Sequence, residues 1–193
     1  MELGWRSTAI VTGLAAVTVV VQLTVASQVG LFGAELNIVP VTVAACGFFA
    51  GPVGGAAAGF ASGAFLDFLS GATAGVSSLV LTLLGFAVGR WRELRDPGNT
   101  LVALPLGAAA VFAYGAGFTA VSFLLDPGDV ARVSWLLARD LVAGALLGAA
   151  AGLPLFALVR KVLRPVLAVD PLERRRRREI RRTGPVGLRG LDI

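Results

Sequence analysis

The sequence predicts an all-α integral membrane protein, folded as a compact bundle of six transmembrane helices. Hydrophobic residues make up 56% of the 193-residue chain and charged residues only 15%, whereas soluble domains usually carry about 25% charged residues. Several stretches contain no charge at all, and roughly 20 apolar residues in a helix are enough to cross a bilayer. These charge-free stretches are residues 7–34, 36–66, 68–89, 100–125 and 141–159.

The predicted transmembrane helices follow the apolar runs in order. They occupy the ranges 8–27, 36–50, 53–69, 75–90, 100–124 and 137–160. The second and third are separated by Gly51 and Pro52, because proline lacks an N–H and interrupts a helix. We expect this pair to form a tight helical hairpin. Residues 1–165 then form the transmembrane domain, and residues 166–193 form a basic cytoplasmic tail.

The basic residues predict the orientation in the membrane. Eleven of the 17 Lys and Arg residues lie from Arg160 onward, and the connection after the fourth predicted helix contains Arg90, Arg92 and Arg95. The connections after the first and third predicted helices contain none. Lys and Arg in short loops are enriched on the cytoplasmic side. Both termini are therefore predicted to be cytoplasmic, which requires an even number of spans.

Glycines recur at every fourth position in two stretches of the sequence, one that runs from the second predicted span into the third and one in the sixth. Because helices in lipid associate through close packing, small residues mark places where backbones approach each other. Each four-residue step turns by about 40° round the helix, so the longer series sweeps about 160°, more than one neighbour covers. It indicates two packing partners or a break, either inside the bundle or at an interface with another membrane protein. The two series are Gly47, Gly51, Gly55, Gly59 and Gly63, and Gly144, Gly148 and Gly152.

Asp67 ends the longer series and is an acid in otherwise apolar sequence. It lies about 22 Å along a helix from Pro52, so it is predicted near the outer face of the membrane. There an ionised acid costs less than at the midplane. Two interpretations remain open: an interfacial acid that accepts from backbone N–H groups near Gly71 and Thr73, or a buried polar contact with a partner or ligand.

The tail contains seven closely spaced arginines. One interpretation is attraction to anionic lipid of the inner leaflet, at about 1 kcal/mol per residue near the surface; the other is contact with a cytoplasmic protein. Nucleic-acid binding is not expected, because a basic excess beside apolar spans is typical of a membrane protein. The arginines are Arg174, Arg175, Arg176, Arg177, Arg178, Arg181 and Arg182.

The sequence offers little for catalysis, and no cofactor or metal is expected. Histidine is absent and Cys46 is the only cysteine, which excludes histidine relays and the common zinc sites. The single lysine, Lys161, follows apolar sequence without a phosphate-binding glycine loop. Intramembrane hydrolysis needs a nucleophile and a base, or clustered charges at one depth. A non-enzymatic protein is therefore predicted.

The segment Val21–Glu93 resembles the MreD family of bacterial rod shape-determining membrane proteins. Gln22 stands where that family has a glutamine near the end of the first span, and "ELN" begins the second. The segment from Gly51 to Asp67, "GPVGGAAAGFASGAFLD", matches the family's GPxxGAxxGFxxGxxxD hairpin. "GVSSL" and "GFAVGR" then match the start and the close of the family's fourth span. The arginine tail is not a family hallmark.

The resemblance implies a non-enzymatic scaffold of the cell-elongation machinery in the bacterial plasma (inner) membrane. Its expected partner is MreC, with the MreB filament, the RodA glycosyltransferase and the transpeptidase of RodA as further candidates. Such a scaffold helps control side-wall peptidoglycan synthesis and cell shape.

A second family gives the alternative function. The six-span fold is also similar to that of the substrate-binding component of energy-coupling-factor vitamin transporters, which often carries a similar "GPxxGAxxG" hairpin. A vitamin binder should line an outer pocket with polar and aromatic side chains. The predicted outer half offers few of these, which favours the scaffold. The few are Asn37, Asp67, Ser70, Thr73 and Trp135, together with acids of the loops.

Overall fold

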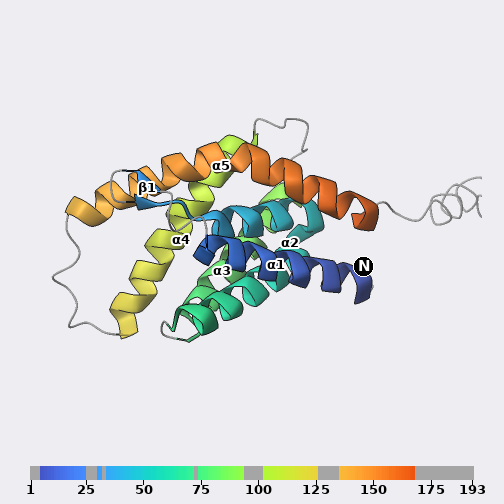
Figure 1. Cartoon of the computed structure of the whole chain (residues 1–193), viewed down its shortest axis with the longest axis horizontal. Helices are drawn as coiled ribbons and strands as arrows, with labels where there is room; N and C mark the ends of the chain where they lie inside the picture. The colour runs from blue at the N-terminus through green and yellow to red at the C-terminus, as the bar shows by residue number, and fades with distance from the viewer. Residues whose placement is uncertain are drawn as a thin grey trace, which may run out of the picture.

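The computed structural model describes residues 5–24, 30–31, 34–71, 74–93, 102–125 and 135–167. These residues form five α-helices and one pair of very short strands (Figure 1). The all-helical class predicted from the composition is confirmed, apart from the strand pair. In chain order the elements are α1 (Trp5–Thr24), β1 (Gly30–Leu31), β2 (Ala34–Glu35), α2 (Ile38–Ser70), α3 (Val76–Glu93), α4 (Ala103–Leu125) and α5 (Trp135–Leu167).

The two strands were predicted only as a connection between helices. They pair antiparallel, with Gly30 opposite Glu35 and Leu31 opposite Ala34. Strand β2 also contacts α5. A turn of this kind leaves no apolar periodicity long enough to be recognised in a sequence.

Helix α2 contains a break where the sequence predicts the end of one helix and the start of another. Gly51 has φ 82° and ψ −176°, which is not helical. Glycine adopts positive φ readily because it has no Cβ, and Pro52 then begins the next segment without the N–H that the break would leave unpaired. Among the described residues there are thus five helices, with α2 in place of the second and third predicted helices. Helix α2 itself comprises two helical segments, residues 38–50 and 52–70.

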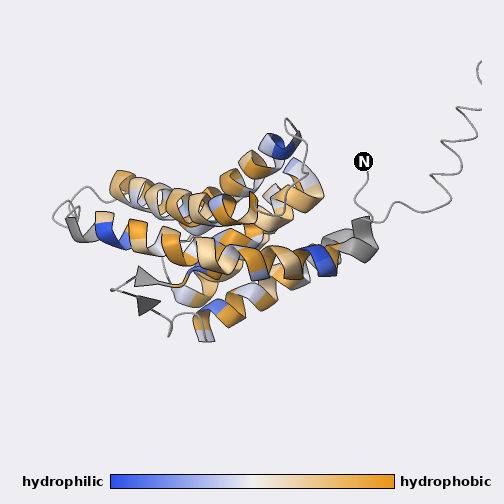
Figure 2. Cartoon of the chain, turned by 90° about the horizontal axis from the view of Figure 1, so that it is seen from above, coloured by the Kyte–Doolittle hydropathy of each residue, from blue (hydrophilic) through white to orange (hydrophobic). Residues whose placement is uncertain are grey.

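Three helices are long and apolar enough to cross a membrane, counting only the residues that the structure describes: Ile38–Ser70, Ala103–Leu125 and Ala138–Leu163. The charge-free run of α5 from Leu141 to Val159 is about 28 Å long, close to the ~30 Å hydrocarbon core of a bilayer. The hydrophilic residues gather toward the helix ends, with apolar residues between them (Figure 2). This distribution is that of a membrane protein.

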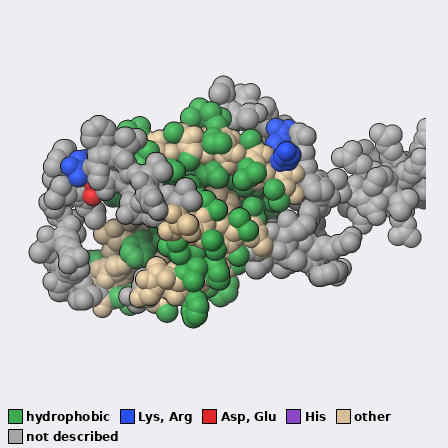
Figure 3. Space-filling view, in the orientation of Figure 1, with side chains coloured by type: hydrophobic (Ala, Val, Ile, Leu, Met, Phe, Trp, Pro, Cys, Tyr) green, Lys and Arg blue, Asp and Glu red, His purple; other side chains and the backbone are tan. Residues whose placement is uncertain are grey.

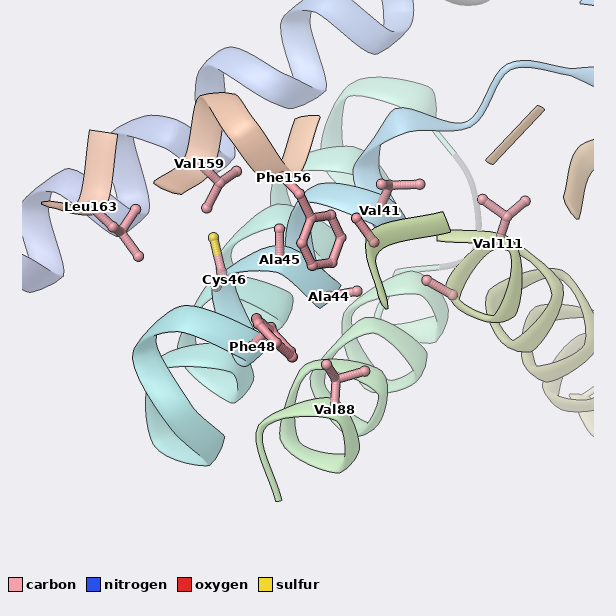
Figure 4. Packing of buried hydrophobic residues seen from close by; sticks show 13 residues of the cluster. Val41, Ala44, Ala45, Cys46, Phe48, Val88, Val111, Phe156, Val159 and Leu163 are labelled. Atoms are coloured by element: carbon pink, nitrogen blue, oxygen red, sulfur yellow. The ribbon is translucent and has the colours of Figure 1, made fainter. Parts of the chain in front are cut away.

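Helix α2 is the centre of the molecule, and it contacts each of the other four helices. Apart from Asp67 and a few hydroxyl residues its sequence is apolar round the whole helix, a pattern that is typical of a buried helix. One cluster of buried side chains joins Cys46 and Phe48 of α2 to Phe156 and Val159 of α5 (Figure 4). A second cluster includes Val39 and Val43 of α2 with Val80, Leu81 and Tyr114 from α3 and α4.

Hydrophobic side chains occupy much of the described surface on the face shown in Figure 3. Phe60 is 62% exposed, Leu83 61% and Leu146 69%. A soluble monomer rarely exposes large contiguous apolar patches. In a bilayer these side chains face lipid tails, which are as apolar as they are.

Candidate functional site

The glycine series of α2 packs directly against the backbone of α3. A Cβ added at Gly55 or Gly59 would collide with the carbonyl oxygen of Gly85 or Leu81. At Gly63 the obstacle is the backbone of Ser78. The contact is reciprocal, since a Cβ at Gly85 would collide with the carbonyl oxygen of Gly55. At these positions the glycines therefore let the two helix backbones meet inside the protein.

The break at Gly51 explains how a series that sweeps so far round the helix can face one neighbour. Gly47 precedes the break and Gly55 follows it, yet a Cβ at either position would collide with the carbonyl oxygen of Gly85. A Cβ at Gly55 would also lie 2.6 Å from the Cα of Gly47. Of the two arrangements that the sequence allows, the structure has the break, and both segments of α2 pack on α3.

The second glycine series, on α5, packs against α4 with uneven tightness. A Cβ at Gly152 would lie 2.5 Å from the carbonyl oxygen of Ala103. One at Gly148 would lie 2.5 Å from Cγ2 of Val111 and 2.8 Å from the carbonyl oxygen of Gly107. At Gly144 the nearest atom, Cγ1 of Val111, would be 3.5 Å away, which is ordinary contact. Only part of this series is held backbone to backbone.

Asp67 caps the start of α3 from the end of α2. It is 4% exposed. Its Oδ2 accepts hydrogen bonds from the backbone N–H groups of Gly75 (2.8 Å) and Ser78 (3.3 Å), and its Oδ1 accepts from Ser77 N–H (3.3 Å). The first N–H groups of a helix have no partner within the helix and favour a negative charge.

The donors to Asp67 thus come from Gly75, in the turn just before α3, and from the first turn of α3. Gly71, expected as a neighbour of this carboxylate, instead ends α2 in the left-handed conformation with φ 64°. Thr73 lies outside the described residues. The arrangement fixes the turn between α2 and α3, which is a structural use of the acid.

A hydrogen bond extends this polar cluster to α4. The hydroxyl of Tyr114 donates to Oγ of Ser77 at 3.2 Å, and Tyr114 is 8% exposed. Tyr114 is not among the candidate residues predicted from the sequence. Its signal was nevertheless there, because it is the only tyrosine of the chain and a buried tyrosine hydroxyl usually finds a partner.

Gln22 caps the start of α2 from α1. Its Oε1 accepts from Ile38 N–H at 2.7 Å, and its Nε2 donates to the carbonyl oxygen of Leu36 at 3.0 Å. The side chain is 7% exposed. Beside it, Oδ1 of Asn37 is buried without a hydrogen-bond partner in the described part of the structure. Only the family resemblance had drawn attention to Gln22.

Arg92, near the end of α3, stabilises the break in α2. The break leaves the last carbonyls of the first segment without regular helical partners, and Nη1 of Arg92 donates to the carbonyl oxygen of Phe49 at 3.2 Å. The guanidinium carbon also lies 5.7 Å from the centre of the Phe48 ring, a cation–π distance. From the sequence, Arg92 served only as an indicator of orientation.

The remaining candidates are not part of this arrangement. The seven tail arginines lie outside the described residues. Cys46 is buried in the apolar core. Within the described ranges no three His, Cys, Asp or Glu residues are grouped to hold a metal ion. The helix-capping hydrogen bonds and the close backbone contacts described above join α1, α2, α3 and α4 to one another.

Comparisons of the chain with protein-family models, with curated proteins and with solved structures find no match.

Proposed function

We propose that this chain is a non-enzymatic membrane scaffold of the bacterial cell-elongation machinery. In this role it binds MreC, and through MreC or directly it meets the MreB filament and RodA with its transpeptidase. It helps to control side-wall peptidoglycan synthesis and thereby cell shape. The proposal rests on the resemblance of Val21–Glu93 to the MreD family.

One structural observation supports the proposal most. The residues that carry the resemblance are the residues that join the first three helices to one another. Gln22 caps α2, the glycine at position 55 meets that at position 85, and Asp67 caps α3. A motif set whose members all serve one packed unit is expected of a shared fold, whereas chance matches would be scattered. A rigid unit of this kind is suited to present a constant surface to partner proteins.

The placement in the membrane is part of the proposal. We infer six spans in the bacterial inner membrane, with the two segments of α2 counted separately and both termini cytoplasmic. The start of α1 and the end of α5 lie at the same end of the molecule (Figure 1), as an even number of crossings requires. The arginine tail would then meet anionic lipid or a cytoplasmic protein at the inner surface.

Affinity capture of the full chain from mildly solubilised membranes tests the scaffold role. MreC should be recovered with the wild-type protein and with a Gly13→Leu variant, because a Cβ at exposed Gly13 would meet no atom within 4 Å. Recovery should fall for Gly55→Leu, which disrupts the packed unit. If depletion of the chain leaves cell width unchanged and MreC is not recovered, the proposal is wrong.

The alternative is the substrate-binding component of an energy-coupling-factor vitamin transporter. The buried Oδ1 of Asn37, which has no hydrogen-bond partner among the described residues, is the observation that favours it, since a ligand donor could satisfy this acceptor. In that case capture should recover an ATPase-coupled transmembrane subunit, and a vitamin should be released from the purified protein on denaturation. The absence of both would leave the scaffold as the better proposal.

A further inference from the structure

We propose that helix α4 contains a hinge at Gly115 and Gly117, and that the residues after it, 118–125, form a strap that opens and closes over Tyr114. The structure has the strap in its closed position, as the end of one continuous helix. The hinge requires neither a protein partner nor a particular orientation of the chain in the membrane. The movement is that of one helix end against α2 and α3.

Gly115 and Gly117 lie in the middle of α4, although glycine is among the poorest helix formers. Close backbone contact accounts for most of the glycine series of α2, but not for these two glycines. A Cβ at Gly115 would collide with Cδ2 of Leu141, and one at Gly117 would lie 2.9 Å from Cγ1 of Val80. Both obstacles are side-chain methyl groups, and that of Leu141 can turn away. The two glycines therefore weaken the helix at a place where no backbone contact requires them.

A hydroxyl group loosens α4 at the same place. Oγ1 of Thr119 donates to the carbonyl oxygen of Gly115 at 2.8 Å. A serine or threonine that bonds back to the carbonyl four residues earlier slightly destabilises a helix and often bends it. Pairs of small residues and side chains that enter the helical ladder are both known causes of kinks. Residues 115–119 contain both, so this is where α4 should bend.

The two halves of α4 are held in different ways. Before the hinge, a Cβ at Gly107 would collide with the carbonyl oxygen of Gly148 on α5, so two backbones meet there. After the hinge, two half-buried side chains, Phe118 and Val121, pack on the second buried cluster, and the last three residues of α4 are exposed. Side chains that leave such a contact meet lipid tails as apolar as the protein. Opening the strap therefore costs little.

Tyr114 is the residue that the closed strap covers. Its ring centre lies 6.0 Å from that of Phe118, and its side chain is almost completely buried. Its hydroxyl donates to Oγ of Ser77, and the backbone N–H of Ser77 donates to Asp67. The hydroxyl bond holds the tyrosine ring in the position against which Phe118 packs. It therefore stabilises the closed strap and links it to the cap of α3.

Double electron–electron resonance of the full chain in lipid nanodiscs tests the hinge. The buried Cys46 is replaced by alanine, and spin labels are attached at two exposed positions, Leu124→Cys in the strap and Leu83→Cys on α3. This pair should give two distance populations, closed and open. A second pair, Ala109→Cys with Leu83→Cys, places its α4 label at an exposed position before the hinge. It should give one population.

Substitutions identify the hinge and the bond that holds it closed. Gly115→Ala with Gly117→Ala should lower the ratio of open to closed populations roughly fivefold, because alanine favours the helix. Gly144→Ala on α5, where the new Cβ makes only ordinary contact, is the matched control and should leave the ratio unchanged. Tyr114→Phe and Ser77→Ala should each raise the ratio about fivefold, because each removes the hydroxyl bond. Ser77→Ala keeps the backbone N–H that Asp67 accepts.

Three results would overturn the proposal. The first is a single population for the strap pair in both the unsubstituted helix and Tyr114→Phe. The second is two populations for the pair before the hinge as well, which would show that α4 moves as a whole. The third is no response to the hinge alanines, or an equal response to Gly144→Ala. Gly115→Ala alone decides the outcome if Gly117→Ala impairs folding. Recovery of MreC is measured separately, so the scaffold role stands or falls independently of the hinge.

Discussion

The two glycine series of this protein look alike in the sequence and differ in the structure. On α2 the glycines meet the backbone of α3, whereas on α5 they meet a mixture of backbone and side-chain atoms of α4. In the most apolar stretch of each helix, 72% of the residues are buried for α2, 17% for α4 and 33% for α5. The same spacing therefore serves a central contact in one place and a peripheral contact in the other.

Polar contacts reinforce the difference. Asp67 and Arg92 each join α2 to α3 by hydrogen bonds, while none joins α4 to α5 among the residues that the structure describes. Backbone atoms cannot move aside for a new side chain, but a valine side chain can change its rotamer. The α2–α3 pair should therefore be rigid and intolerant of substitution, and the α4–α5 pair should be more adaptable.

The largest expected effect is that of Gly59→Leu in the α2–α3 pair. The new side chain would collide with the carbonyl group of Leu81 and with the N–H of Thr82, and neither helix can retreat without breaking the other glycine contacts. We expect a loss of about 3 kcal/mol or more in the free energy of unfolding. Thermal unfolding of the detergent-purified protein measures it, with Gly13→Leu as the control that should unfold like the wild type.

Asp67→Leu should have the next largest effect, again on the α2–α3 pair. It leaves three N–H groups at the start of α3 without an acceptor in an apolar setting, at about 1–3 kcal/mol for each group that finds no other partner. Asp67→Asn should be milder, because the amide keeps one acceptor oxygen. Thermal unfolding and a cell-width assay compare the two. Equal defects would show that the negative charge itself is required, rather than the capping.

The smallest effects are expected in the α4–α5 pair, where two glycines of the same series differ in how tightly they pack. Gly148→Ala brings a Cβ to 2.5 Å from Val111 and 2.8 Å from the Gly107 carbonyl oxygen, whereas Gly144→Ala brings one to 3.5 Å from Val111. We expect a loss of about 1–2 kcal/mol for the first, since the valine can adjust but the carbonyl oxygen of Gly107 cannot, and almost none for the second. Thermal unfolding of both variants in one detergent checks the order. A larger loss at 144 than at 148 would contradict the packing described here.

The membrane class and the approximate positions of the helices could be predicted from the sequence alone. Charge-free runs of a bilayer's length have no stable alternative to a helix in lipid, where every backbone polar group must be paired within the segment. The break was also predictable, because Pro52 cannot supply the N–H that a continuous helix needs. Those are local constraints, and local sequence is sufficient for them.

The contacts of the glycines, Asp67, Arg92 and Tyr114, in contrast, depend on the tertiary structure. The glycine spacing was compatible with an internal or an external neighbour, and it was the fold that placed α3 against both segments of α2. The sequence left two interpretations of Asp67 open, backbone donors near Gly71 and Thr73 or a partner or ligand. Its donors are the N–H groups of Gly75, in the turn before α3, and of Ser77 and Ser78 in the first turn of α3. Arg92 and Tyr114 have partners 43 and 37 residues away. Such contacts depend on the relative placement of helices, which side-chain spacing along one helix does not specify.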